Sequence, residues 1–215
     1  MAVLILGGTQ EARELKALLG DDAILALART TRFGGAEGLA AYVEQHGITT
    51  IVDATHPFAT RISANAQHAG VRVIRLERPG FVPEPGDDWT YVDTLAHAEL
   101  PADARVFLTT GHHEVEALDA HPAFFLVRAL NPPPTLPPHH ELILAKGPFD
   151  LSTELALIER HQLTHLVTKD SGGPDAKLQA ARAKSLRVVL IRRPLKPPVA
   201  TTAETPEAVS LLLSD

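Results

Sequence analysis

A strand–helix unit occurs twice in this chain, and this internal repeat constrains the fold more than any other feature of the sequence. Residues 46–79 (HGITTIVDATHPFATRISANAQHAGVRVIRLERP) align without a gap over residues 161–194 (HQLTHLVTKDSGGPDAKLQAARAKSLRVVLIRRP). In both segments a short apolar run leads into a polar corner, a helical stretch and a second apolar run that ends in Arg-Pro. Repetition of one supersecondary unit predicts two half-domains of similar architecture.

Short apolar runs also alternate with helical stretches along the first half of the chain. The apolar runs are 2–6, 23–28, 49–53 and 71–76, and the helical stretches between them are 10–19, 37–45 and 60–68. Parallel strands need crossover connections, and helices then cover both faces of the sheet. We therefore expect an α/β protein with two Rossmann-like, doubly wound parallel sheets related by internal duplication. Any two α/β units would share part of this periodicity even without a duplication, and the expected architecture would then be the same.

The expected domains are residues 1–100 and residues 101–215, and the second includes a C-terminal helix near 205–213. The proline- and glycine-containing segment 79–101 is typical of a linker, with one short strand at 89–92. A second proline-rich segment, 131–138, has no partner in the repeat. Such an inserted loop is either a lid or binding loop, or a rigid surface spacer.

Composition excludes several classes of protein. The formal net charge of the 215 residues is -6, which gives no general attraction to nucleic acid or to an anionic membrane. The chain has no cysteine and no apolar run approaching the ~20 residues that span a bilayer. Motifs for zinc proteases, serine hydrolases and phosphate-binding loops are missing, and no metal site is expected. We expect a soluble, cytoplasmic protein with neither nucleic-acid nor membrane partners.

Ligands of open α/β sheets bind at the carboxyl ends of the strands. Gly7, Gly8 and Thr9 follow the first apolar run, where glycines and a helix N-terminus accommodate a phosphate. Thr9 could equally be only the helix N-cap. Arg29 and Thr30 follow the second run, where dinucleotide folds carry a carboxylate for NAD or an arginine for the 2′-phosphate of NADP. The residues present favour NADP, with a solvated turn as the alternative.

Further polar residues follow the remaining strands. Thr55, His56 and Pro57 form a corner after the third run, where the histidine is either structural or ligand-binding, and Arg61 lies one turn further on. The second half carries a parallel set of small, hydroxyl-bearing and basic residues: Thr110, Gly111, Arg128, Lys169, Ser171, Gly172, Gly173 and Lys177. Basic groups bind carboxylates by charge-assisted hydrogen bonds. Their shared location in an acidic chain indicates an anionic ligand larger than one nucleotide.

The motifs GGTQEAR, DATHPFA, TTGHHE, VRAL, KGPF and TKDSGG, in this order, resemble those of the precorrin-6A reductase family over nearly the whole chain. The resemblance implies two Rossmann-like domains without the usual glycine fingerprint, with NADPH and a tetrapyrrole bound between them. It also implies NADPH-dependent reduction of one double bond of precorrin-6A in cobalamin biosynthesis. Hydride would go to one carbon and a proton to its neighbour. We assign NADPH mainly to the N-terminal domain and the tetrapyrrole mainly to the C-terminal domain.

The resemblance also guides the site assignment. We predict coenzyme contacts at Gly7, Gly8, Thr9, Arg29, Thr30, Thr55, His56, Pro57, Thr110 and Gly111. We predict substrate contacts at Arg13, Arg61, Arg128, Lys169, Ser171, Gly172, Gly173 and Lys177. The candidate proton donors are His56, Asp170 and a bound water, and the product could pass directly to the next enzyme of the pathway. The alternatives are an NADP-dependent reductase of another small molecule and a non-catalytic NADP-sensing module.

Overall fold

The computed structural model describes residues 2–27, 31–111 and 114–214, and the chain divides into two compact units. Unit 1 comprises Met1–Pro79 and Pro194–Asp215, and unit 2 comprises Gly80–Arg193. The division therefore falls at residue 80 rather than at residue 100. The C-terminal helix, which we expected in the second domain, belongs to unit 1 because its apolar face packs on the first sheet.

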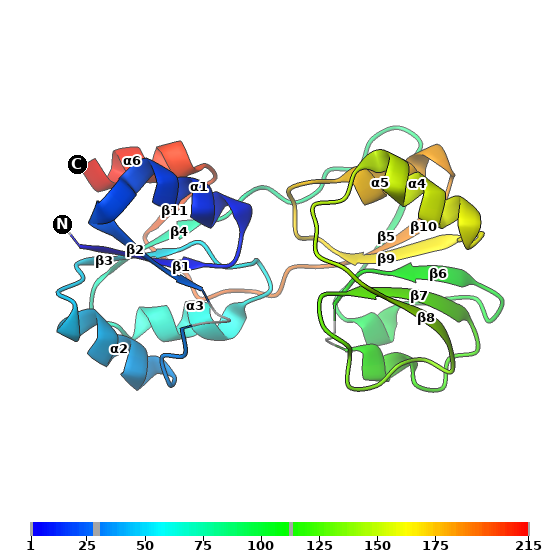
Figure 1. Cartoon of the computed structure of the whole chain (residues 1–215), viewed down its shortest axis with the longest axis horizontal. Coiled ribbons are helices and arrows are strands. Elements are labelled where there is room, and N and C mark those ends of the chain that lie inside the picture. The colour runs from blue at the N-terminus through cyan, green and yellow to red at the C-terminus, as the bar shows by residue number, and fades with distance from the viewer. Residues whose placement is uncertain (1, 28–30, 112–113, 215) are drawn as a thin grey trace. The chain divides into compact units, whose positions relative to one another are not determined.

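Unit 1 contains one parallel sheet with the strand order β11-β4-β3-β1-β2 (Figure 1). Its strands are β1 (Val3–Gly7), β2 (Ala23–Leu27), β3 (Thr50–Asp53), β4 (Arg72–Leu76) and β11 (Thr201–Ala203). Helices α1 (Gln10–Leu19) and α6 (Pro206–Ser214) lie on one face, and α2 (Ala36–Gln45) and α3 (Thr60–Gln67) lie on the other, as Figure 1 shows. A short 3₁₀ helix, η1 (Gly20–Asp22), follows α1.

Strand β1 shows why a parallel sheet forms here. All five of its residues are buried, as expected for a strand covered on both faces. Alternate side chains point to opposite faces. Val3 and Ile5 share a core cluster with Val209 of α6, whereas Leu4 shares the opposite cluster with Leu39 of α2.

Unit 2 contains a six-stranded parallel sheet with the order β5-β10-β9-β6-β7-β8. Its strands are β5 (Asp88–Val92), β6 (Arg105–Leu108), β7 (Phe124–Ala129), β8 (His139–Leu144), β9 (His165–Lys169) and β10 (Arg187–Ile191). Helices α4 (Leu151–Arg160) and α5 (Ala176–Ala183) cover one face (Figure 1). Between its other strands, the described residues of this unit form the short 3₁₀ helices η2 (Leu95–His97) and η3 (Val115–Leu118).

The two sheets confirm the expected α/β fold with two related halves. The order β2-β1-β3-β4-β11 in unit 1 matches β7-β6-β9-β10-β5 in unit 2. The proline-rich segment 131–138 leads into β8, which is an additional edge strand. After β4 the chain leaves unit 1 and forms β5 in unit 2, and after β10 it returns to form β11 in unit 1. Each sheet thus has one edge strand that the chain forms after it has crossed between the units: β5 in unit 2 and β11 in unit 1.

Candidate functional site

Two glycines shape the turn between β1 and α1. Gly8 has a φ of +145° and faces open space, whereas a Cβ atom on Gly7 would lie 2.6 Å from Cδ1 of Leu25. The Thr9 hydroxyl accepts a hydrogen bond from the Ala12 amide at 3.1 Å and donates one to the Ala54 carbonyl at 2.9 Å. Thr9 is therefore the N-cap of α1, and it also ties the glycine turn to the end of β3.

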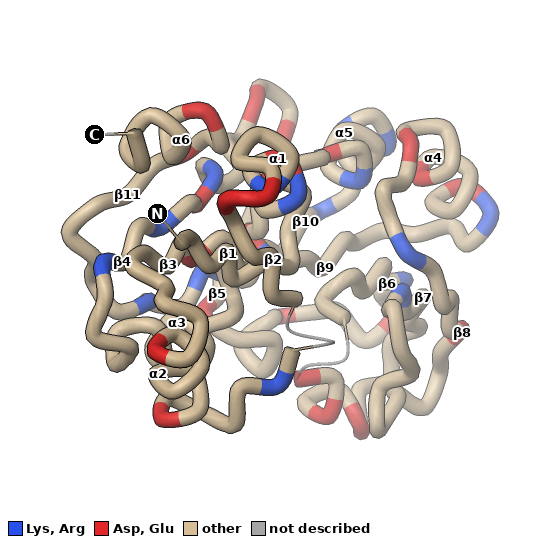
Figure 2. Tube along the Cα trace, turned by 60° about the vertical axis from the view of Figure 1, so that its left-hand side comes forward, with Lys and Arg blue, Asp and Glu red and all other residues tan. Residues whose placement is uncertain are grey.

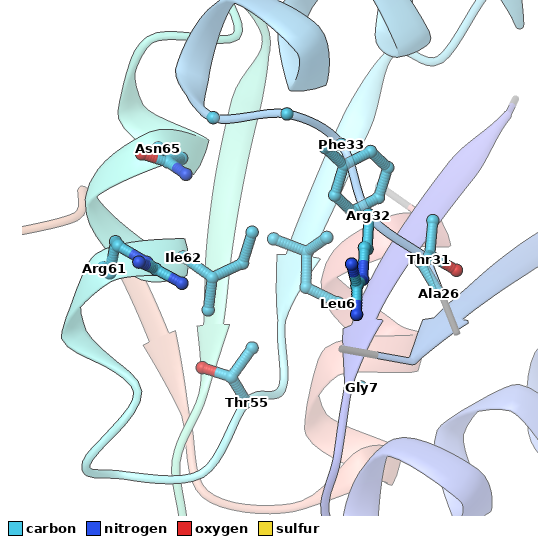
Figure 3. A pocket seen from close by; sticks show the side chains of 12 residues that line it. Leu6, Gly7, Ala26, Thr31, Arg32, Phe33, Thr55, Arg61, Ile62 and Asn65 are labelled. Carbon is cyan, nitrogen blue, oxygen red and sulfur yellow. The ribbon is translucent and has the colours of Figure 1, made fainter. Parts of the chain in front are cut away.

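A cavity of about 630 Å³ opens beside this turn, at the carboxyl ends of β1, β2 and β3. Arg61 reaches it from α3 and Arg32 from the loop after β2, as Figure 3 shows. Among the described residues, the lining includes two guanidinium groups and no carboxylate: Leu6, Gly7, Ala26, Thr31, Arg32, Phe33, Gly34, Gly35, Thr55, Arg61, Ile62 and Asn65. Its volume is in the range of small-molecule sites, and its charge suits an anionic ligand.

The predicted basic residues of unit 1 have different surroundings. Arg61 and Gly7, assigned to substrate and coenzyme respectively, line the same cavity. Arg13 is exposed on α1 and does not line this cavity. Arg29 and Thr30 lie outside the described residues, while their neighbours Thr31 and Arg32 line the cavity. The described part of the loop after β2 thus lies at the cavity, and its use by a coenzyme stays a prediction.

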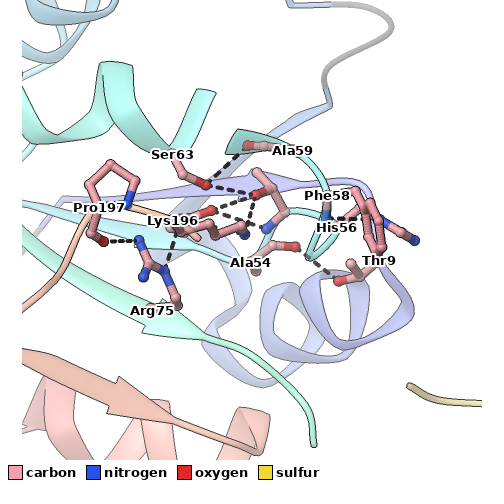
Figure 4. A network of polar contacts seen from close by, with 11 residues as sticks. Thr9, Ala54, His56, Phe58, Ala59, Ser63, Arg75, Lys196 and Pro197 are labelled. Atoms are coloured by element: carbon pink, nitrogen blue, oxygen red, sulfur yellow. Dashed lines mark hydrogen bonds and ion pairs between the residues drawn. The ribbon is translucent and has the colours of Figure 1, made fainter. Parts of the chain in front are cut away.

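A buried charged network lies behind the cavity wall, at the end of β3 (Figure 4). Asp53 is fully buried and accepts a hydrogen bond from the Thr55 hydroxyl at 2.6 Å. Arg75 Nε lies 3.4 Å from Asp53 Oδ2, and Lys196 Nζ lies 3.9 Å from the same oxygen. Lys196 Nζ also donates to Thr55 Oγ1 at 3.2 Å. The hydroxyl of Thr55 is thus oriented by the protein, with its hydrogen directed to Asp53.

His56 and Pro57 complete the corner after β3. The Phe58 amide donates to His56 Nδ1 at 3.3 Å, which favours the neutral tautomer with its hydrogen on Nε2. The ring centroids of His56 and Phe58 are 5.7 Å apart, and Pro57 is buried. Neither His56 nor Pro57 lines the cavity.

In unit 2 the strand order changes direction between β6 and β9, and two predicted residues lie at this point. Thr110 is buried, and among the described residues its hydroxyl has no hydrogen-bond partner. Burial lowers the pKa of Lys169, and the negative charge of Glu114 opposes this shift. An unsatisfied buried hydroxyl usually indicates a missing polar partner. Thr110 and Lys169 are consistent with a second polar ligand site in this unit.

The loop after β9 contacts both segments at which the chain passes between the units, near residues 80 and 193. The Asp170 carboxylate accepts the Phe81 amide at 2.8 Å, and its carbonyl accepts Arg193 Nε at 2.8 Å. Asp170 therefore has a structural role, since it anchors the outgoing and returning segments on unit 2. Gly172 and Gly173 follow with φ values of +65° and +79°, which continue the loop in a conformation that favours glycine.

Arg128 has a role that the sequence did not reveal. It is buried and forms two hydrogen bonds, of 3.0 and 2.8 Å, with the carboxylate of Glu154. Its guanidinium also lies 3.8 Å from the ring centroid of Phe149. Arg128 and Lys177 line one small cavity of about 130 Å³. Since Glu154 balances the charge of Arg128, Arg128 is a weak candidate for an anion contact there.

Several residues of these sites were not predicted. Phe33 and Asn65 line the unit 1 cavity, Arg75 and Lys196 hold the network around Asp53, and Arg78 binds Glu11 of α1 with both N–O distances at 2.8 Å. Burial is the largest single effect and would raise the pKa of Glu11, but the hydrogen bond and charge of Arg78, together with hydrogen bonds from the backbone and Thr9, outweigh it and lower the pKa. Lys196 lies in the proline-containing segment just after the last strand of the repeat, β10, which ends at Ile191, and this position could have marked it.

A parallel sheet with a glycine turn, a helix N-terminus and an arginine-lined cavity at its carboxyl edge defines a Rossmann-like nucleotide-binding protein. The family model for precorrin-6x reductase CbiJ/CobK matches residues 21–212. The chain therefore belongs to the precorrin-6x reductase family.

Curated relatives match this sequence over nearly the full length of both chains. Precorrin-6A reductase of Rhodococcus erythropolis is 45% identical, and the match covers 94% of this chain and 93% of the relative. The Sinorhizobium sp. enzyme of the same name is 40% identical, with coverages of 97% and 91%. The solved structure of CobK precorrin-6A reductase superimposes with a TM-score of 0.91 and 37% identity, covering 100% of this chain and 97% of that structure.

Two further features were searched for in the described parts of the chain. Within 2–27, 31–111 and 114–214, no helix is both long and apolar enough to cross a membrane. Within the same ranges, no three His, Cys, Asp or Glu side chains come together as metal ligands would. Lys and Arg are interspersed with Asp and Glu over both units (Figure 2). Many of these cations are paired, as in Arg182 with Asp87 and Arg192 with Asp93.

Proposed function

We propose that this protein is a cytoplasmic reductase that uses NADPH to saturate one carbon–carbon double bond of precorrin-6A during cobalamin biosynthesis. The observation that carries the proposal is the family membership, which extends over residues 21–212. Relatives and a solved structure that share the name precorrin-6A reductase support the same substrate. The cavity of unit 1 supports the choice of coenzyme.

The residues of unit 1 suit a phosphorylated dinucleotide. Gly8 faces open space and leaves room for a pyrophosphate at the N-terminus of α1, where free amides favour anions. Arg32 and Arg61 would hold the 2′-phosphate that distinguishes NADPH from NADH. In this proposal Arg61 serves the coenzyme, whereas the sequence alone placed it with the substrate. Bound NADPH supplies the hydride, and the protein supplies orientation and charge.

The residues of unit 2 suit a polycarboxylate substrate. Lys169 and Lys177 would pair with acetate or propionate groups of the macrocycle by charge-assisted hydrogen bonds. The buried hydroxyl of Thr110 would gain the partner that it lacks among the described residues. Ser171 and the two glycines after it would let the macrocycle approach the backbone closely. Arg128, which is bound by Glu154, would contribute shape rather than a free charge.

The predicted side-chain proton donors, His56 and Asp170, each accept a hydrogen bond from a backbone amide. Asp170 accepts the Phe81 amide through Oδ1, so a donor role would place its proton on Oδ2. The Phe58 contact favours the neutral tautomer of His56, and a donor role would require the imidazolium, which has no lone pair on Nδ1 for that contact. Transfer of the product to the next enzyme of the pathway stays a prediction from the sequence.

The test is anaerobic turnover with purified protein. Precorrin-6A and its cobalt form are each offered with NADPH and, separately, with NADH, and loss of reduced-nicotinamide absorbance is recorded. Turnover with NADPH supports the proposal, and preference for one metallation state assigns the substrate. Tight NADPH binding without turnover of either macrocycle would refute the reductase and favour the sensing module. Turnover of simple carbonyl compounds instead would favour a reductase of another small molecule.

A further inference from the structure

Lys196 lies in the segment by which the chain returns to unit 1, yet its side chain is only 4% exposed. The preceding residue, Leu195, is 97% exposed. Two contacts hold the segment on unit 1 just after Leu195. Lys196 Nζ binds Thr55 Oγ1 at 3.2 Å, and Arg75 Nη2 donates to the Pro197 carbonyl at 2.8 Å. The returning chain therefore enters unit 1 at the end of β3 with a buried ammonium group.

The contact partner of Lys196 belongs to the wall of the coenzyme cavity. Thr55 lines that cavity together with Gly7 and Arg61. The Thr55 hydroxyl donates to Asp53 at 2.6 Å and accepts from Lys196, so its hydrogen and one lone pair are both used. A hydroxyl held from two sides has one orientation, because rotation would break both contacts.

We infer that Lys196 is a positioning residue for the coenzyme, which acts through the Thr55 hydroxyl. It fixes the cavity wall at the end of β3 and places a positive charge behind it. A positive charge in a poorly solvated environment favours an anionic ligand nearby. This inference rests on the proposed use of NADPH. It adds Lys196, from the segment by which the chain returns to unit 1, to the residues that shape the proposed coenzyme site.

The inference predicts effects on binding rather than on chemistry. Lys196→Met keeps most of the side-chain length but removes the ammonium group, and Thr55→Val keeps the shape but removes the hydroxyl. Each variant should weaken NADPH binding about tenfold, the equivalent of one charge-assisted hydrogen bond. The Michaelis constant for NADPH should rise by a similar factor, while kcat at saturating NADPH changes much less.

The double variant tests whether the lysine acts through the threonine. If it does, Lys196→Met/Thr55→Val should bind NADPH about as weakly as either single variant, because the second change removes a contact already lost. Leu195→Ala is the matched control, since it alters the same segment at an exposed side chain. Dissociation constants are measured by titration of the protein with NADPH in the absence of substrate, and thermal melting of each variant without ligand verifies folding.

Each outcome decides the inference. A folded Lys196→Met variant with the wild-type dissociation constant would overturn it. It would also be overturned if the double variant weakened NADPH binding by the product of the two factors measured for the single variants. Should Lys196→Met fail to fold, Thr55→Val decides alone, and unchanged NADPH binding by it would overturn the inference. Absence of NADPH binding by the unaltered protein would refute the proposed coenzyme and this inference together. Tight binding by wild type and by Lys196→Met alike would refute only the role of Lys196.

Discussion

The buried pair Arg128–Glu154 gives the sharpest test of the description of unit 2. The side chains are 7% and 2% exposed, and two hydrogen bonds of 3.0 and 2.8 Å join them. Replacing Glu154 by leucine leaves the guanidinium without its carboxylate in a buried site. Breaking such a pair from one side costs about 3–5 kcal/mol of unfolding free energy. Substituting both partners with apolar residues of similar volume is often close to neutral, so Arg128→Met/Glu154→Leu should recover most of the loss.

The sequence offers a fluorescent probe for the unfolding of unit 2 and a control substitution on the same helix. Trp89 is the only tryptophan, and it packs against the core of unit 2, so its fluorescence during urea unfolding reports on this unit. Glu159 lies on the same helix α4 and pairs with Lys184 on the surface, where the side chains are 62% and 37% exposed. Glu159→Leu should cost no more than about 1 kcal/mol. A Glu154→Leu variant as stable as the Glu159→Leu variant would refute the structural role of Arg128.

Three further predictions concern the turn, the cavity and the pH response. Gly8→Ala should cost about 1–3 kcal/mol in thermal unfolding, because a φ of +145° is strained for any side chain; an unchanged melting temperature would contradict the turn geometry. Arg32→Ala should raise the Michaelis constant for NADPH about tenfold and leave that for NADH nearly unchanged; equal rises would argue against a 2′-phosphate contact. Burial, followed by the charge of Arg187, lowers the pKa of His165 from 6.5, although Asp103 and Asp88 partly oppose this. The unfolded chain therefore takes up the proton first as the pH falls through 6.5, so unit 2 should lose stability there. His165→Gln should flatten that dependence in Trp89-monitored unfolding, and an equally steep curve would contradict it.

Much of the fold could be predicted because the repeat is local. The alignment of residues 46–79 over 161–194 places β3 over β9, α3 over α5 and β4 over β10, as the structure has them. The exchange of edge strands was not foreseen. Strand β11 has only three residues and follows a proline-rich segment, so nothing in its local pattern identifies its partner β4. A strand's partner is set by tertiary packing, which residues 201–203 alone do not encode.

In the candidate site, too, local motifs could be predicted from the sequence, whereas contacts between residues far apart in the chain could not. The glycine turn and the loop after β2 are local motifs, and their neighbourhood at one sheet edge follows from parallel topology. The pairing of Arg128 depends on Glu154, which is 26 residues away, and Lys196 meets Thr55 across 141 residues. A charged side chain looks the same in the sequence whether it faces a ligand or a buried partner. Motifs therefore predicted where a ligand site should lie, while the structure shows which of its charged side chains are paired with others, as Arg128 is with Glu154.

The exchanged edge strands set an order of events during synthesis on the ribosome. Unit 2 is continuous in sequence from Gly80 to Arg193, so all of its strands have been made before the end of the chain appears. Unit 1 needs β11 beside β4, and it needs Val209 of α6 in the core cluster that contains Ile5 and Leu15. Until those last residues have emerged, its sheet keeps an open edge and an uncovered apolar face. The half that is translated first is therefore the half that finishes folding last.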